Sequence, residues 1–225
     1  MKISRMMAAG LLIACGVSAS AHRRYFAYTY DWFTPSMNEK ELELYWTQKE
    51  GGDATAQIEF EYGITDRWMV APYAIFSHTD GEVDFEGWKL ETRYRFGDFA
   101  YDTLMPGIYF EVKKVEGEDA TAEAKLITTL MTQSGLIWSA NLVAETALDG
   151  DEKVEWAYVT GIAQRMSERL HLGFEFKGHL VEDGHSAGPS FAYSLSPNQK
   201  LFGTALFSYP GGGKHEFRVL FEHEF

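Results

Sequence analysis

Apolar and polar side chains alternate along almost the whole chain from residue 39 onward. Runs of about ten alternating residues are separated by Gly, Asp, Asn or Pro. A period of two places successive side chains on opposite faces of a β-strand, whereas a helix would repeat its apolar residues every three or four positions. The pattern predicts an all-β protein. We expect twelve strands, at residues 39–49, 55–63, 67–78, 83–96, 104–115, 120–133, 136–148, 153–165, 169–181, 187–195, 199–209 and 214–225.

The breaks between these strands alternate in character along the chain. An up-and-down barrel that spans a membrane has short turns at one end, longer loops at the other, an even strand number and both termini on one side. Twelve strands satisfy that parity, and only the connection at 97–103 is long for the turn side. We therefore predict a single antiparallel transmembrane β-barrel. The tight turns are expected at 64–67, 133–135, 166–169 and 196–199, and acidic or glycine-rich loops near Gly52, Asp80, Gly117, Gly150, Gly184 and Gly212.

Residues 1–21 have the parts of an export signal, with a basic start, an apolar run at 6–17 and the small residues 19–21 that suit signal peptidase. The run is too short to span a membrane. Cleavage after residue 21 would remove the one cysteine of the chain, and with it any disulfide or thiolate chemistry. The alternative is lipidation at Cys15, because residues 12–15 resemble a bacterial lipobox.

Residues 22–37 precede the first expected strand and alternate in part as well. They could form a periplasmic lead-in, a luminal tail or a further strand. The expected organisation is a signal peptide at 1–21, this N-terminal periplasmic or luminal segment at 22–37, and an outer-membrane barrel at 38–225.

The last expected strand ends on a free aromatic residue. This ending resembles the C-terminal assembly signal of Gram-negative outer-membrane β-barrels. The resemblance implies export to the cell outer membrane and recognition of the last strand by the barrel assembly machinery. The candidate assembly-signal residues are Phe217, Val219, Phe221 and Phe225.

Each strand has one apolar and one charged face, so the protein's surroundings decide which face points inward. In a membrane barrel the apolar face meets lipid and the charged face lines the lumen. A soluble sandwich or a lipocalin-like barrel would have the opposite arrangement. The export signal, the aromatic ending and the strand number together favour the membrane barrel.

The charged face predicts a narrow lumen that contains water, because so many charges cannot be buried without partners or solvent. The first hairpin should carry an acidic inner wall with a basic row nearby, which would favour cations; the alternative is a static ladder of ion pairs that seals the lumen. Because like charges that oppose one another are unfavourable, counter-charges or bound cations should lie near the acidic wall. Since closure places the last strand beside the first, Arg218 can be that neighbour. The candidate lumen and selectivity residues are Glu41, Glu43, Glu59, Glu61, Lys89, Arg93, Arg95, Glu111 and Arg218.

The run EYGITDRWMVAPY at 61–73, preceded by ELELYW at 41–46, resembles a broad family of small Gram-negative outer-membrane proteins of the transporter or porin-like type. The likeness covers the first third of the chain, and the remainder only by its strand pattern. It implies a barrel and passage of solutes. The run itself is a strand, a tight turn and a strand, so it transfers no functional residue.

Passive diffusion of small polar or cationic solutes is the leading expected function, and a non-conducting structural or interaction barrel is the main alternative. The other expected partners are outer-membrane lipid and lipopolysaccharide. The net charge of −13 argues against nucleic acid. A lipid hydrolase is less favoured, because its only candidate pair, His185 and Ser186, would point to opposite faces of a strand. We expect no catalytic residue, cofactor or metal site.

Overall fold

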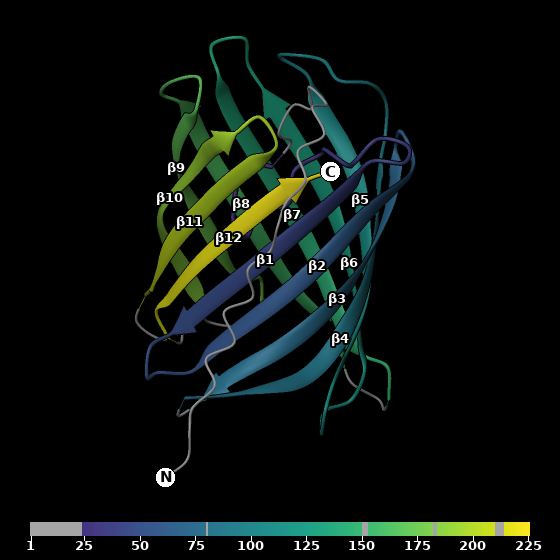
Figure 1. Cartoon of the computed structure of the whole chain (residues 1–225), viewed down its shortest axis with the longest axis vertical. Coiled ribbons are helices and arrows are strands. Elements are labelled where there is room, and N and C mark those ends of the chain that lie inside the picture. The colour runs from purple at the N-terminus through teal and green to yellow at the C-terminus, as the bar shows by residue number, and fades with distance from the viewer. Residues whose placement is uncertain (1–23, 80, 150–152, 182–183, 210–213) are drawn as a thin grey trace.

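The computed structural model of the protein describes residues 24–79, 81–149, 153–181, 184–209 and 214–225. Twelve antiparallel strands form a closed barrel, which confirms the predicted fold class (Figure 1). The predicted signal peptide and Cys15 lie outside the described residues. The strands are β1 (Lys40–Lys49), β2 (Ala54–Thr65), β3 (Trp68–Thr79), β4 (Glu82–Arg95), β5 (Leu104–Val115), β6 (Thr121–Met131), β7 (Leu136–Ala147), β8 (Glu155–Arg165), β9 (Leu170–His179), β10 (His185–Ser196), β11 (Gln199–Ser208) and β12 (Glu216–Glu224).

No helix within the described residues is long and apolar enough to cross a membrane.

The barrel closes where the first strand, β1, pairs with the last, β12. All remaining pairs join strands that follow one another in the chain. At this seam Leu44 lies opposite Phe221, and the amide of Phe225 donates a hydrogen bond to the carbonyl of Lys40 (3.0 Å). The seam continues with Val219 opposite Trp46 and Phe217 opposite Gln48. Closure leaves no strand edge unpaired, which removes the main aggregation hazard of a β-sheet.

The apolar face of the sheet forms the outside of the barrel. In β1, Glu43 and Tyr45 are buried inside, whereas Leu44 and Trp46 are exposed. The other strands also carry exposed apolar residues, so the soluble sandwich and the lipocalin-like barrel are excluded, because both would hide that face. The exposed apolar side chains include Ile58, Phe60, Leu90, Phe110, Leu126, Leu142, Phe174 and Phe217.

The two ends of the barrel differ in their connections. We call the end with the start of β1 and the C-terminus the turn end; it is uppermost in Figure 1. We call the opposite end the loop end. The loop expected near Asp80 is shorter than predicted, because β3 extends to Thr79 and β4 begins at Glu82. The turn end is formed by connections 66–67, 96–103, 132–135, 166–169 and 197–198. The loop end lies where β1 is followed by β2, β3 by β4, β5 by β6, β7 by β8, β9 by β10 and β11 by β12.

Residues 24–37, which we call the luminal segment, belong to no strand. Residues 24–35 lie inside the barrel, whereas Met37 is exposed. Phe26 and Trp32 of this segment are fully buried and pack with Met105 and Ile137 of the wall. The apolar packing inside the barrel therefore includes a stretch of chain that enters the lumen from outside the strands.

The apolar exterior predicts a large cost for a charge placed there. Ile58 lies near the middle of β2 with its side chain outward. We expect Ile58→Arg to lower the free energy of unfolding in lipid bilayers by about 2–4 kcal/mol, the range for Arg at the midplane of a bilayer. Equilibrium unfolding in urea with Ile58→Leu as the control would measure this. A change no larger than that of the control would contradict an exterior embedded in lipid.

Candidate functional site

The luminal segment is held by one carboxylate of the wall. Glu175 of β9 is fully buried, and its two oxygens accept hydrogen bonds from the amides of Ala27 (3.0 Å), Tyr28 (2.8 Å) and Thr29 (2.8 Å) and from the Thr29 hydroxyl (3.0 Å). Buried amides need partners, and this segment has no neighbouring strand to supply carbonyl groups. A carboxylate can accept several amide hydrogen bonds, so Glu175 alone provides the acceptors for three consecutive amides.

Two further wall residues continue this support along the segment. Asn141 accepts from the amide of Tyr30 and donates to its carbonyl, both at 2.8 Å, and Thr129 accepts from the amide of Trp32 at 2.9 Å. The side chains of β9, β7 and β6 thus replace a pairing strand. In the sequence Glu175 is one of many charges on the polar faces of the strands, and no pattern there indicates that it binds the luminal segment.

Both ends of the luminal segment lie toward the turn end, and its middle reaches the centre of the barrel. The carbonyl of Arg24 accepts a hydrogen bond from Lys200 near the start of β11, and the amide of Asn38 donates to the carbonyl of Gly63 near the end of β2. Gly161 gives Phe26 its space, since a Cβ there would lie 2.5 Å from the Phe26 ring. The segment consequently fills the turn-end half of the lumen.

The acidic inner wall of the first hairpin is present, but its counter-charges differ from those expected. Glu43 pairs with Arg24 of the luminal segment (2.7 Å), and Arg93 of β4 pairs with Glu61 and with Glu91 (2.8 Å). All five of these side chains are buried.

The prediction that Arg218 neutralises the acidic wall is wrong. Arg218 lies opposite Thr47 and donates to its hydroxyl at 2.9 Å, whereas Glu43 lies opposite Glu222 further toward the turn end. The strand order had been predicted, but the stagger of β12 along β1 places Arg218 four residues from the level of Glu43.

The predicted basic row is interleaved with acids instead of facing them. Lys89 pairs with Glu111 at 2.9 Å, and Arg95 donates to the carbonyl of Asp66 at 2.8 Å and lies over the Trp32 ring. Of the other acidic candidates, Glu41 pairs in register with Glu61 and Glu224, and Glu59 with Glu43.

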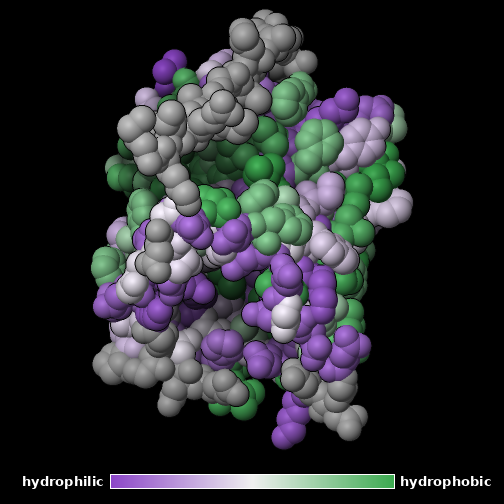
Figure 2. Space-filling view, turned by 60° about the horizontal axis from the view of Figure 1, so that its bottom comes forward, coloured by the Kyte–Doolittle hydropathy of each residue, from purple (hydrophilic) through white to green (hydrophobic). Residues whose placement is uncertain are grey.

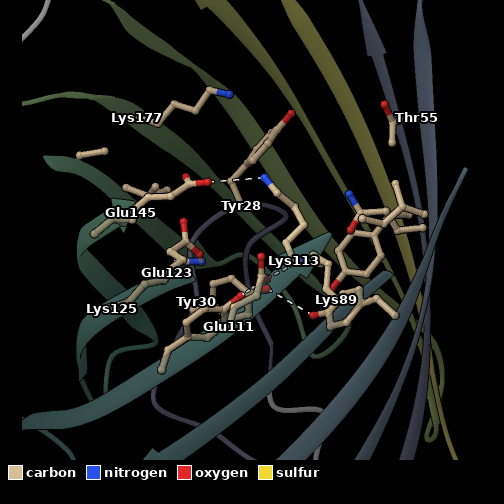
Figure 3. Close-up of a pocket in the computed structure, with 18 of the residues that line it drawn as sticks. Tyr28, Tyr30, Thr55, Lys89, Glu111, Lys113, Glu123, Lys125, Glu145 and Lys177 are labelled. Atoms are coloured by element: carbon tan, nitrogen blue, oxygen red, sulfur yellow. Dashed lines mark hydrogen bonds and ion pairs between the residues drawn. The ribbon is translucent and has the colours of Figure 1, made fainter. Parts of the chain in front are cut away.

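A cavity of about 610 Å³, which we call the vestibule, lies between the luminal segment and the loop end of the barrel. Tyr28 and Tyr30 of the segment lie at its centre among charged side chains of the wall (Figure 3). Figure 2, in which this end is turned toward the viewer, shows hydrophilic side chains around a hollow. Its volume is within the range of pockets that hold small molecules. Among the described residues, the glutamate, lysine and arginine side chains that line it are Lys49, Glu86, Lys89, Glu111, Lys113, Glu118, Glu123, Lys125, Glu145, Glu155, Lys177 and Arg218. Tyr45, Tyr73 and Tyr109 line it as well.

Four lysines among the described residues of the vestibule form ion pairs, including that of Lys89 with Glu111. The Nζ atom of Lys125 is 2.9 Å from Glu123, that of Lys113 is 3.5 Å from Glu145, and that of Lys177 is 2.7 Å from Glu216. Several cations also lie over tyrosine rings, which adds attraction to the ring face. These contacts are Lys89 over Tyr73 (3.9 Å), Lys125 over Tyr109 (4.0 Å), Lys177 over Tyr28 (4.6 Å) and Arg218 over Tyr28 (3.7 Å).

Asp31 of the luminal segment, outside the strands, has a shifted pKa. Burial raises the pKa of Asp31 from 3.8 to about 7, while Arg24, Arg93 and the amide of Phe33 act in the opposite direction. The folded segment therefore favours protonated Asp31, and the contribution of this group to stability falls as the pH rises from about 4 to 7.

The hydrolase candidates do not form a catalytic pair. Nδ1 of His185 is 3.2 Å from the Tyr158 hydroxyl on the exposed side, whereas the Ser186 hydroxyl is buried and 3.0 Å from that of Ser208. Adjacent residues of β10 point to opposite faces, as expected for a strand. This separation removes the serine–histidine contact that nucleophilic catalysis requires.

No protein-family model matches the sequence, and no curated protein sequence is similar to it. Solved structures with the same fold include a KdgM porin in complex with disordered oligogalacturonate (TM-score 0.66, 8% identity, covering 82% of this chain and 99% of that one). Another is the NanC porin (TM-score 0.60, 9% identity, 82% and 100%). A third is the outer membrane protein Omp33 of Acinetobacter baumannii (TM-score 0.54, 10% identity, 84% and 98%). At these identities the likeness establishes a fold shared with porins, and the family resemblance at 61–73 stays a prediction.

Proposed function

We propose that this chain is a porin-like barrel of the Gram-negative outer membrane, and that small polar solutes enter it through the loop-end vestibule. The observation that carries the proposal is the vestibule of about 610 Å³, a polar cavity inside a barrel with an apolar exterior. The export signal expected at 1–21 and the aromatic residues of β12 support the location. In that membrane the turn end faces the periplasm, the loop end faces outward beside lipopolysaccharide, and Phe217, Val219, Phe221 and Phe225 are offered to the assembly machinery.

The lining of the vestibule favours solutes whose charge is zero or balanced. Six basic and six acidic side chains are among the described residues that line it. Because the two signs are equal in number among these residues, the vestibule itself should select only weakly for cations. Tyrosine rings and paired charges can together contact polar, uncharged surfaces such as those of sugars, or the two charges of a zwitterion.

The oligogalacturonate bound in the KdgM porin complex suggests a saccharide as the solute. The wall of this vestibule does not favour the negative charge of that polymer. Glu111, Glu123 and Glu145 would repel an anionic polymer at the positions where their lysine partners attract it. A neutral or zwitterionic solute fits the same wall without this conflict.

One observation favours the rival, a non-conducting envelope barrel. The luminal segment fills the turn-end half of the lumen with Phe26 and Trp32 fully buried. On our proposal this is the closed state of a channel, and conduction requires the segment to leave its position. On the rival the segment is a permanent seal.

Conductance in planar bilayers separates the two functions. We expect folded wild-type protein to conduct rarely, and Glu175→Ala to conduct more often, because the substitution leaves three buried amides of the segment without their acceptor. A loss of about 2 kcal/mol in the closed state corresponds to a roughly thirtyfold rise in the ratio of open to closed channels. Glu168→Ala, in an exposed turn, is the matched control. If wild type, Glu175→Ala and a variant lacking residues 24–35 all fold but pass no current, the rival holds.

Charge changes on one ion pair test the route of the solute. In the variant lacking residues 24–35, we expect Lys113→Glu to shift the zero-current potential in a KCl gradient toward cation selectivity and Glu145→Lys to shift it toward anion selectivity. The two residues are partners at 3.5 Å, so they probe one point of the wall with opposite signs. Equal potentials in both variants would mean that ions do not pass through the vestibule.

A further inference from the structure

Three carboxylates meet inside the barrel where β1, β2 and the luminal segment come together. They belong to Glu43, Glu59 and Glu61, and one oxygen of each lies within 4.8 Å of the others. Glu43 and Glu59 are register partners, and the exposed fractions of the three residues are 2%, 0% and 2%. Like charges placed opposite one another are unfavourable unless something positive lies between them.

The basic side chains that contact this group do not balance it. Arg24 pairs with Glu43, and Arg93 pairs with both Glu61 and the fully buried Glu91. Four carboxylates against two guanidinium groups leave an excess of two negative charges (4 minus 2). Burying such an excess without compensation costs far more than a folded domain can supply.

The hydroxyl of Tyr45 lies between Glu43 and Glu59 but cannot satisfy both carboxylates. It accepts a hydrogen bond from Arg24 at 2.8 Å and contacts oxygens of both Glu43 and Glu59, the latter at 2.6 Å. A phenol has one proton, so it can donate to only one of the two carboxylates. The other oxygen of Glu59, Oε1, is buried without a hydrogen-bond partner. Glu43 also accepts from Arg24, so Tyr45 can donate to Glu59 and both carboxylates then have a donor. The fully buried Oε1 of Glu59 remains without a partner in either case.

We propose that Glu43, Glu59 and Glu61 bind one divalent cation of the Ca²⁺ type. A charge of two matches the excess, and carboxylate oxygens are the ligands that hard cations prefer. Ca²⁺ binds oxygens at about 2.3–2.6 Å, so ligands on opposite sides of it can be about 5 Å apart, a wider spacing than Mg²⁺ tolerates. The bond from Arg24 uses Oε2 of Glu43 and that from Arg93 uses Oε1 of Glu61, so the cation takes the other oxygen of each and Oε1 of Glu59.

A small cavity beside the carboxylates provides room for a further ligand. It measures about 10 Å³ and is lined by the ligands Glu43 and Glu61 but not by Glu59. The other charged residues that line it are Arg24, Asp31, Glu41, Arg93 and Glu222. This is close to the space that a single water needs. Ca²⁺ requires six to eight oxygens, and a water in this cavity would add to those of the three carboxylates.

The test is a Ca²⁺ titration of the mature chain, refolded in detergent without lipopolysaccharide and freed of metal with a chelator. Isothermal titration calorimetry should give one saturable site per chain. Glu59→Gln keeps the shape of the side chain but removes its charge, and we expect it to weaken binding at least about tenfold. Glu123→Gln, which also removes a luminal carboxylate but lies in the vestibule, should change the affinity less than about twofold.

Folded wild-type protein that binds no Ca²⁺ with one-to-one saturation would overturn the proposal, and the excess charge would then be removed by protons shared between the carboxylates. Equal affinities for wild type and Glu59→Gln would overturn it as well. Should Glu59→Gln fail to fold, unfolding of wild type in increasing Ca²⁺ decides, because an ion bound only by the native barrel stabilises it by mass action. Binding is measured without any current, so it stands or falls separately from conduction.

Discussion

The hydrogen bonds between Glu175 and the luminal segment are the interaction on which the closed lumen depends. A segment inside a barrel has no strand beside it, so its amides need acceptors on side chains. Asp31 within the segment accepts from the amides of Tyr25 and Phe33, and side chains of the wall accept from others. One carboxylate satisfies three consecutive amides at Ala27, Tyr28 and Thr29, at the point where the segment reaches deepest. Asn141 and Thr129 accept hydrogen bonds from the amides of Tyr30 and Trp32, which follow the residues held by Glu175.

The luminal segment also supplies positive charge to the acidic wall of the first hairpin. Period-two alternation directs every second residue of each strand inward, and in the first hairpin those residues are glutamates. The segment brings Arg24 to Glu43 and places the carbonyl of Phe33 3.3 Å from Arg93. Barrel wall and segment are thus parts of one electrostatic unit in the closed barrel.

The sequence was enough to predict the strands, their number and the inward charged face, because each follows from the local period of two. The position of the luminal segment was not predictable, since Ala27 and Glu175 are 148 residues apart and no pattern links them. Arg218 illustrates the same limit at the seam. Closure made β12 the neighbour of β1, but the stagger that sets Arg218 opposite Thr47 is a property of the whole barrel and its tilt.

The lumen has two electrostatic zones, and they depend on the segment to different degrees. Opening would remove Tyr28 and Tyr30 from the vestibule, but not the ion pairs of its wall. The vestibule keeps its ion pairs whether or not the segment is present, because Lys113–Glu145 and Lys125–Glu123 lie entirely within the wall. The turn-end half does not, because the departure of the segment removes Arg24 from Glu43. On the proposed function, the turn-end half would then become an acidic constriction next to a neutral vestibule. Selection by the vestibule and attraction of cations by the constriction would act in series, and the second would exist only in the open barrel.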